Sequence, residues 1–299
     1  MSSANRRLCE ERDVPCNWGR WGDEDQRGTA NLLSEDGVLA ASRLVGRGKV
    51  YSLAAPLSPD GPNLPTRRPT WHVVTQRQRA SGGDDMSADD VIMMHTHGTT
   101  HIDALCHIFV GDTLYNGHPA SSITPYGAQK CGVENVGPIV GRGVLLDIAT
   151  FRNRQRLESG EPITPDDLDA CAKAEGVDIR PGDIVLVRTG WWQLHAEGVD
   201  ARKSFYDGEP GPDGDCGNWF QARDIVALGA DNPAVEVVAS WRDSLPLHRA
   251  VIWGCGGYLL EFLDLEALAR DRAYEFMFVA TPLLLDGGIG SPIVPLAIV

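Results

Sequence analysis

The segment His97-Gly-Thr-Thr-His-Ile-Asp-Ala-Leu-Cys-His107 is the densest group of potential metal-binding side chains in the chain. Five of the eight histidines fall in or close to this segment, where an even spread would place about one. Neutral imidazole nitrogens and carboxylates are the donors that hold Zn²⁺, Mn²⁺ or Fe²⁺ in proteins. We therefore predict a metal site that contains His97, His101 and Asp103. The alternative is a group of buried histidines that only hydrogen-bond locally.

Two local structures would bring these ligands together. On a helix, His97 and His101 would share a face, but Gly98 and the two threonines that follow it argue against a regular helix. The alternative is a strand that ends near His95 or His97, followed by a tight turn at Gly98. In the extended chain after that turn, His101 and Asp103 would point the same way because they are two residues apart.

The other histidines are expected to have supporting or structural roles. His95 lies just outside the ligand set, His118 belongs to the loop-like sequence Tyr-Asn-Gly-His-Pro, and His72 and His195 are isolated. A lone histidine is more often a hydrogen-bonded residue of the core or of a loop than a metal ligand.

The composition narrows the class of protein. The chain has 299 residues, 42% of them hydrophobic, and 41 acidic against 27 basic residues give a net charge of -14. Such a surface repels phosphate backbones and anionic membranes, so neither nucleic acid nor a membrane is an expected partner. No run of 18 apolar residues and no apolar signal-peptide core occur, which predicts a cytoplasmic location. The seven cysteines are well spread without a CxxC pair, and we expect most of them to be reduced.

The pattern of apolar residues predicts a mixed α/β chain with some antiparallel pairing. Strand-like runs lie at residues 50–57, 71–75, 91–94, 144–148, 184–189, 225–228, 258–260 and 276–280. Helix signals follow Ser34 and Thr164, the second helix ending at Gly176, and a third helix is expected at residues 263–269. The glycine- and proline-rich residues 207–217 are expected to form a surface excursion that can act as a mobile flap.

The sequence HGTTHIDALCH resembles the HxGTHxDxPxH signature of the cyclase family of metal-dependent hydrolases, which includes bacterial kynurenine formamidase and isatin hydrolase. The histidines, Thr100 and Asp103 match. Gly98 stands one place early, Thr99 occupies the position of the family's glycine, and Leu105 replaces the proline. Further segments resemble the longer members of the family, at residues 17–22, 115–117, 141–147, 182–183, 188–191 and 290–292.

The resemblance implies a swivelling β/β/α fold in one domain over residues 1–299, with an N-terminal extension of about residues 1–48, assembled as a homodimer or homotetramer. It also implies one or two Zn or Mn ions per chain. By position, His97, His101 and Asp103 would bind the first ion, and His107 would be the general acid and base.

The resemblance extends to a second group of residues. His248 and Glu261 match the ligands of a second metal in binuclear members, bridged to the first by Asp103. A carboxylate that only marks the solvent end of a strand is the alternative for Glu261. Eight tryptophans offer aromatic surface, and Trp21 and Trp71 precede the motif as family members place aromatic residues over the site.

The expected reaction is hydrolysis of an amide, cyclic amide or ester carbonyl in a small, aromatic or cyclic substrate. A divalent cation makes hydroxide available at neutral pH, and a histidine with an ordinary pKa near about 6.5 can carry the proton. One alternative is a metal-dependent cyclase, dehydratase or isomerase, in which the ion stabilises an oxyanion. The other is a metal-binding or assembly protein without catalysis.

Overall fold

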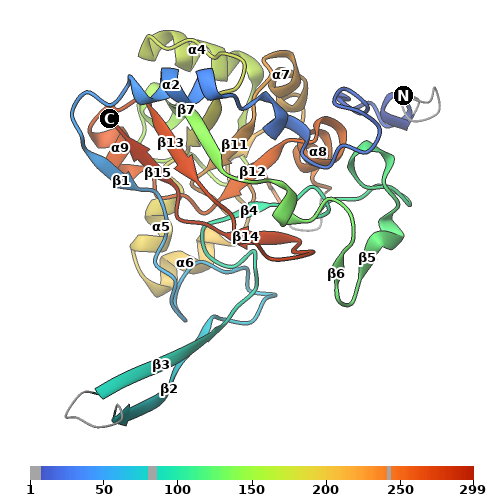
Figure 1. Cartoon of the computed structure of the whole chain (residues 1–299). Coiled ribbons are helices and arrows are strands. Elements are labelled where there is room, and N and C mark those ends of the chain that lie inside the picture. Colours follow the sequence, from blue (N-terminus) through green and yellow to red (C-terminus); the bar gives the residue numbers. More distant parts are fainter. Residues whose placement is uncertain (1–7, 80–85, 241–243) are drawn as a thin grey trace.

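The computed structural model describes residues 8–79, 86–240 and 244–299. Its centre is a mixed sheet, to which the described residues contribute nine strands (Figure 1). From one edge to the other, these are β1 (Val50–Ser52), β15 (Leu296–Ile298), β13 (Glu275–Ala280), β7 (Ile139–Asp147), β9 (Ile184–Arg188), β11 (Ala227–Ala230), β12 (Tyr258–Glu261), β4 (His101–Asp103) and β14 (Gly290–Pro292). Strands β7, β9, β11 and β12 run parallel, and the other neighbours pair antiparallel. The predicted mixed α/β fold in a single domain is confirmed, and each predicted strand run overlaps a strand.

The parallel strands form the buried centre of the sheet. All five residues of β9 are buried, as expected for an apolar run covered on both faces. Helices α2 (Glu35–Ser42) and α4 (Pro165–Glu175) pack against β7 on one side (Figure 1). Thr164 and Asp167 cap α4 reciprocally and Gly176 ends it in the left-handed conformation, as the sequence predicts.

The remaining helices are short. They are α3 (Ile148–Phe151), α5 (Trp192–Ala196), α6 (Val199–Phe205), α7 (Cys216–Ala222), α8 (Pro246–His248), the π-helix η5 (Arg249–Cys255), α9 (Glu266–Arg270), and the 3-10 turns η1 (Gly28–Leu32), η2 (Tyr115–Gly117), η3 (Ala120–Ser122) and η4 (Val133–Asn135). The helix predicted from residue 263 begins three residues later, because Leu263 is still extended and bonded to Ala230 and Ala54. No helix in the described ranges is long and apolar enough to span a membrane.

Residues 207–217 do not form the predicted surface flap. Strand β10 (Gly211–Pro212) pairs with β8 (Pro162–Ile163), and the backbone of Glu209 exchanges two hydrogen bonds with that of Val238. The Glu209 side chain is fully buried. The backbone donors and acceptors of the segment thus find partners inside the molecule, which the glycine and proline content does not reveal.

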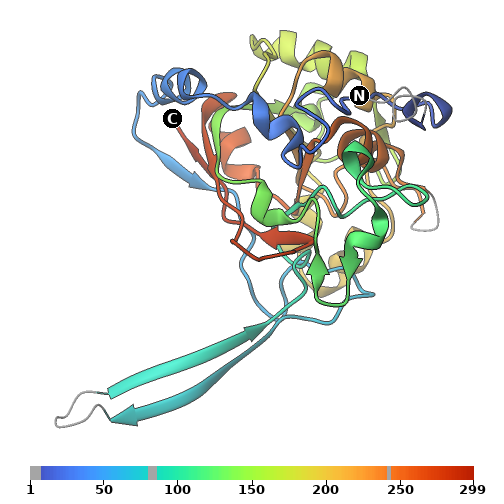
Figure 2. The ribbon, with the colours of Figure 1, turned by 45° about the vertical axis from the view of Figure 1, so that its right-hand side comes forward.

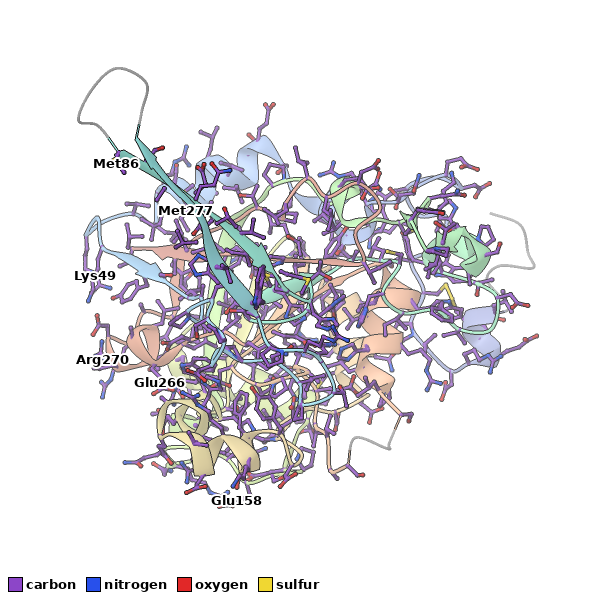
Figure 3. The ribbon with its side chains drawn as sticks, turned by 90° about the horizontal axis from the view of Figure 1, so that it is seen from below. Lys49, Met86, Glu158, Glu266, Arg270 and Met277 are labelled. Atoms are coloured by element: carbon purple, nitrogen blue, oxygen red, sulfur yellow. A yellow bond between two sulfur atoms is a disulfide. The ribbon has the colours of Figure 1, made fainter. Side chains whose placement is uncertain are left out.

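Strands β2 (Trp71–Arg79) and β3 (Met86–Met93) form an antiparallel ribbon, here called the arm, that projects from the rest of the molecule (Figures 1 and 2). Among the described strands, these two pair only with each other. Met86 marks the far end of the arm in Figure 3. A smaller hairpin, β5 (Ile123–Thr124) with β6 (Gly127–Ala128), lies on the other side of the body.

The cysteines are mostly reduced, as predicted. Five of them are free and buried. Cys9 and Cys16 form a disulfide. The segment that carries the disulfide packs onto the body through buried Trp18, whose indole N–H donates to the carbonyl of Trp253.

Candidate metal centre and active site

The sheet register places the predicted ligands on one face at its β14 edge. Strand β4 lies between β12 and β14, with Glu261 opposite His101 on one side and Gly290 opposite Asp103 on the other. Directly opposed residues share a face, and residues two apart on a strand share it too. His101, Asp103 and Glu261 therefore face the same side, and the intervening Ile102 turns into the core.

The turn before β4 has the extended geometry that the sequence analysis offered as the second possibility, and the helical alternative is wrong. The amide of Gly98 donates to the carbonyl of His95 at 2.9 Å. The left-handed residue is Thr99, with φ of 71°, and not the glycine before it. A β-branched residue in this region is strained by about 1–3 kcal/mol and persists only where its surroundings fix it. Here the Thr99 amide donates to the carbonyl of Pro62 at 2.7 Å.

The neighbouring hydroxyl fastens the turn to the end of β12. Thr100 Oγ1 donates to the carbonyl of Phe262 at 2.6 Å and accepts from the amide of Ala55 at 2.8 Å. Phe262 follows Glu261 directly and also has a positive φ, of 56°. The strained turn and the strand end that carries Glu261 are thereby tied to each other.

The predicted metal ligands gather around Asp103 and are here called the cluster: His97, His101, Asp103, His248 and Glu261. Its Oδ1 is 3.3 Å from His97 Nε2 and 3.5 Å from His101 Nε2, and its Oδ2 is 3.8 Å from His248 Nε2. Glu261 contacts two of the same rings, at 3.0 Å from His101 Nε2 and 3.2 Å from His248 Nε2. The fold thus joins two parts of the chain that are more than 140 residues apart in sequence.

The far nitrogen of each ring is occupied, which leaves Nε2 for the centre of the cluster. His101 Nδ1 bonds to the carbonyl of Thr99 at 2.9 Å, and His97 Nδ1 bonds to the hydroxyl of Thr96 at 3.2 Å. Gly290 lets the His97 ring approach the sheet, because a Cβ on Gly290 would lie 2.6 Å from His97 Nε2.

The donor set fits divalent cations. Among the described residues, His97 Nε2, His101 Nε2 and both carboxylate oxygens of Asp103 are buried without an aligned hydrogen bond. Buried polar atoms normally have partners, so four ligand-type atoms without one in a single cluster indicate that it binds cations. Ligand atoms lie within 4.8 Å of one another in two groups, His97 with Asp103 and His107, and Asp103 with His248 and Glu261. Asp103 belongs to both groups, which is the arrangement of a bridging carboxylate.

The charges of the cluster are strongly coupled. Burial opposes the charge of His101, but Glu261 and Asp103 outweigh it and raise the pKa of His101 to about 9. Burial also opposes the charge of Asp103, yet the surrounding histidines hold the pKa of its carboxyl well below its ordinary value. The carboxylates therefore stay ionised and available to a cation.

His107 is half-buried beside the same centre. Its ring centroid is 4.2 Å from that of His97 and 6.5 Å from that of His248. Burial lowers the pKa of His107 to about 4, so the ring is neutral at pH 7 and carries a lone pair. The position suits the predicted general base, and the first group of ligand atoms shows that it also suits a metal ligand.

Two buried glutamates near the cluster are not recognisable from the sequence. Glu236 bonds to His248 Nδ1 at 2.6 Å. The second is Glu209, whose carboxyl accepts from the amide of Ala234 at 2.7 Å. Burial raises the pKa of Glu209 well above its ordinary value. Neither residue has a ligand-like spacing to another, so no sequence signal marks them.

The structure places the two predicted substrate-binding tryptophans outside the cluster. Trp21 is half-buried, and the guanidinium carbon of Arg20 lies 4.8 Å from the centroid of its indole ring. Trp71 begins the arm, opposite Met93, and is 48% exposed. In the described part of the chain, neither makes a ring contact or a hydrogen bond with the cluster residues. Their substrate roles stay predictions.

The four histidines expected to have supporting or structural roles belong to neither group of ligand atoms. His95 is exposed, His118 bonds to the carbonyl of Asp25, His72 pairs with Asp90 on the arm, and His195 stacks on Trp192.

An apolar groove of about 650 Å³ borders the turn that carries His97. Its walls come from the segment after β1, the base of the arm and the chain on either side of β14, at residues 54–57, 92–96, 281–283 and 292–294. Thr96 and Thr99 line it on both sides of His97, and Pro292, another lining residue, is paired with His101. An apolar body in this groove would lie next to the cluster.

Comparisons with known proteins agree with this geometry. The family described as "Putative cyclase" matches residues 51–237. A crystal structure described as that of a novel cyclase is 36% identical, with 95% of this chain and 100% of that chain covered and a TM-score of 0.90. Isatin hydrolase A from Ralstonia solanacearum is 25% identical, with coverage of 89% and 97% and a TM-score of 0.64.

More distant structures share the fold. A predicted metal-dependent hydrolase from Bacillus stearothermophilus is 22% identical, with coverage of 83% and 97% and a TM-score of 0.54. The comparison with curated proteins found no match. Because one family matches more than half of the chain and a cyclase structure matches nearly all of it, this protein belongs to the cyclase family.

Proposed function

We propose that the protein is a metal-dependent hydrolase that cleaves an amide, cyclic amide or ester carbonyl of a small substrate. The observation that carries the proposal is the set of buried, orphaned nitrogen and oxygen donors around Asp103. His97, His101 and Asp103 would hold one Zn or Mn ion, and His248 and Glu261, with Asp103 as the bridge, would hold a second. Such ions, when bound, make water more acidic and polarise a carbonyl oxygen.

His107 is the residue that moves the proton in this proposal. Its neutral ring lies beside His97 without a carboxylate partner of its own among the described residues, so a lone pair is free for the proton of the attacking water. The same ring then returns the proton to the leaving nitrogen or oxygen. The ring of His107 packs against that of His97, with 4.2 Å between the two centroids.

The groove indicates the substrate class. Its walls are apolar, apart from threonines, and it starts at residues next to His97. Aromatic or cyclic carbonyl compounds present a flat apolar body beside the reacting group, which fits such a site. Formamides, lactams, cyclic imides, isatin-like diones and lactones are therefore the compounds to test first.

The test is a screen of these compounds with the metal-loaded protein, read by mass spectrometry in ¹⁸O-labelled water. Hydrolysis adds one water mass and one labelled oxygen to the product. A product without the label would instead support a cyclase, dehydratase or isomerase, and turnover of none of the compounds would count against the proposal. His72→Ala on the arm is the control for the metal content of the cluster variants, because it removes an exposed histidine that belongs to neither group of ligand atoms.

We also propose that the protein forms a homo-oligomer through its arm. Trp71, Val73, Val91 and Met93 are cross-strand partners and share one face of the arm, where they are 36–59% exposed. A two-stranded ribbon is marginal in water by itself, and exposed apolar patches usually mark contacts. A second copy of the chain offers the same face, so a reciprocal contact would close with twofold symmetry.

A further inference from the structure

We propose that Glu236 is a positioning residue that fixes the ring of His248 and thereby sets the affinity of the second cation position. The inference rests on the proposed function, since it assigns a role toward the ion that His248 and Glu261 would hold. It concerns a residue that carries no ligand atom of either cation position.

Glu236 holds His248 through both of its carboxylate oxygens. Its Oε1 accepts from His248 Nδ1 at 2.6 Å and from the His248 amide at 2.8 Å, and its Oε2 accepts from the Leu247 amide at 3.0 Å. Glu236 is 1% exposed and His248 is 2% exposed, so water does not compete for these bonds. Ring, backbone and carboxylate thus form one rigid unit.

This unit selects one form of the ring. When a cation occupies this position, a carboxylate that accepts from Nδ1 keeps the proton on that nitrogen, and the lone pair of Nε2 is left for the ion. His248 Nε2 then lies 3.2 Å from Glu261 Oε1 and 3.8 Å from Asp103 Oδ2. A ring free to turn or to change its tautomer would present this lone pair only part of the time, and the ion would bind more weakly.

The backbone supports the same placement. Val235 has a φ of 60° although it is β-branched, and the Glu236 amide closes a tight turn on the carbonyl of Ala234. The carbonyl of Val235 accepts from the side-chain amide of Asn232 at 3.2 Å, and this hydrogen bond also holds the turn. Such strain persists where the surroundings impose it, and here it aims a carboxylate at the next segment of the cluster.

Glu209 provides a matched control. It is a second buried carboxyl close to the cluster, but it bonds to the Ala234 amide and makes no hydrogen bond with His248 among the described residues. Replacement of either glutamate by glutamine preserves the shape of the side chain. Only the change at Glu236 removes the charged partner of the ring.

The experiment is calorimetric titration of the metal-free full chain with Mn²⁺ and, separately, with Zn²⁺. For Glu236→Gln we expect the affinity of the second site to fall about 10- to 100-fold, with the first site unchanged. Glu209→Gln should stay within about twofold of the wild type at both sites. Glu236→Ala, which also removes the acceptor, should lose more affinity, and NMR spectra of the metal-free protein should lose the signal of the hydrogen-bonded Nδ1–H of His248.

The outcomes separate the two proposals. A wild-type chain that binds no metal would overturn the proposed function. Two ions in the wild type with unchanged second-site affinity in folded Glu236→Gln and Glu236→Ala would overturn the role of Glu236 alone. A single ion in the wild type, unaffected by either variant, would also overturn it and would leave His97, His101 and Asp103 as the site.

Discussion

The cluster around Asp103 and the arm depart from ordinary protein structure in opposite directions. The cluster buries polar atoms that have no aligned hydrogen bond, at the edge of the main sheet. The arm exposes apolar side chains on a ribbon that pairs with no other described strand. In the cluster, burying polar atoms without a partner costs free energy. In the arm, exposing apolar side chains to water costs free energy.

The difference teaches what each region lacks. A bound cation would give the unpaired nitrogens and carboxylate oxygens of the cluster a partner, whereas another apolar surface would bury the exposed side chains of the arm. The two regions also differ in strain. Thr99, Val235 and Phe262, each within two residues of His101, Glu236 or Glu261, have positive φ values, and we expect the cluster to keep its shape when the arm is changed. Variants in one region should therefore leave the other intact.

The largest effect is expected from His101→Ala. This variant removes the ring that contacts both Asp103 and Glu261, and the loss of one ligand from a small set collapses metal affinity. Elemental analysis of the purified protein should show that most of the metal is gone. His72→Ala on the arm should keep its metal. Unchanged metal content in His101→Ala would remove the basis of the proposed function.

His107→Ala should separate binding from chemistry. With the metal retained and the fold intact, turnover should fall by about 10²–10⁴-fold, the usual effect of removing a general base. Steady-state kinetics and elemental analysis on the same preparation decide the matter. A loss of metal in proportion to the loss of activity would make His107 a ligand, as its place beside His97 and Asp103 also allows.

Val91→Lys tests the other region. It puts a charge in the middle of the apolar face of the arm, which should weaken self-association by about 10²-fold or more if a second copy buries that face. Light scattering after size exclusion should then report the 32.4 kDa of one chain instead of a multiple of it. Val74→Lys, on the opposite face of the same strand pair, is the control that should stay associated. A wild-type protein that is already a monomer would contradict the proposal.

The sequence predicts much of the fold and of the cluster, and the predictions that it does not allow have physical causes. The mixed sheet and the family are confirmed, because strand periodicity and the HGTTHIDALCH motif are local signals. Glu236 has no such signal, because a strained turn at Val235, imposed by tertiary contacts, places its carboxylate against His248. The buried path of residues 207–217 was missed for the same reason.

The turn at Thr99 shows how a local rule can mislead. Glycine is the usual residue for a positive φ, so the sequence points to Gly98 as the turn residue. The fold instead puts that conformation on Thr99, which keeps a side chain at the wall of the groove. Sequence alone does not reveal which of two neighbouring residues carries the strain.

The smallest predicted effect concerns a carboxylate that lacks the histidines of the cluster. Glu175, at the end of α4, accepts from the amide of Asp147 at 3.0 Å, and its second oxygen is buried without a hydrogen bond among the described residues. Burial, and then repulsion from Asp147, raise the pKa of Glu175 to about 7. Asp103 stays ionised because histidines surround it, whereas Glu175 has no such cation beside it and takes up a proton.

Glu175→Gln should therefore change how stability depends on pH. Because the pKa of Glu175 is higher in the folded than in the unfolded chain, the folded state binds more protons between about pH 4.5 and 7, and its stability falls as the pH rises through that window. Glutamine keeps the acceptor for the Asp147 amide but does not titrate, so the variant should match the wild type near pH 4.5 and exceed it above pH 7. For a side chain still partly open to water we expect about 1 kcal/mol, or about 2 °C in Tm for a chain of this size. Thermal melts of the metal-free proteins at pH 5 and pH 8 measure the difference, and an equal Tm gap at both values would show that Glu175 stays ionised in the fold.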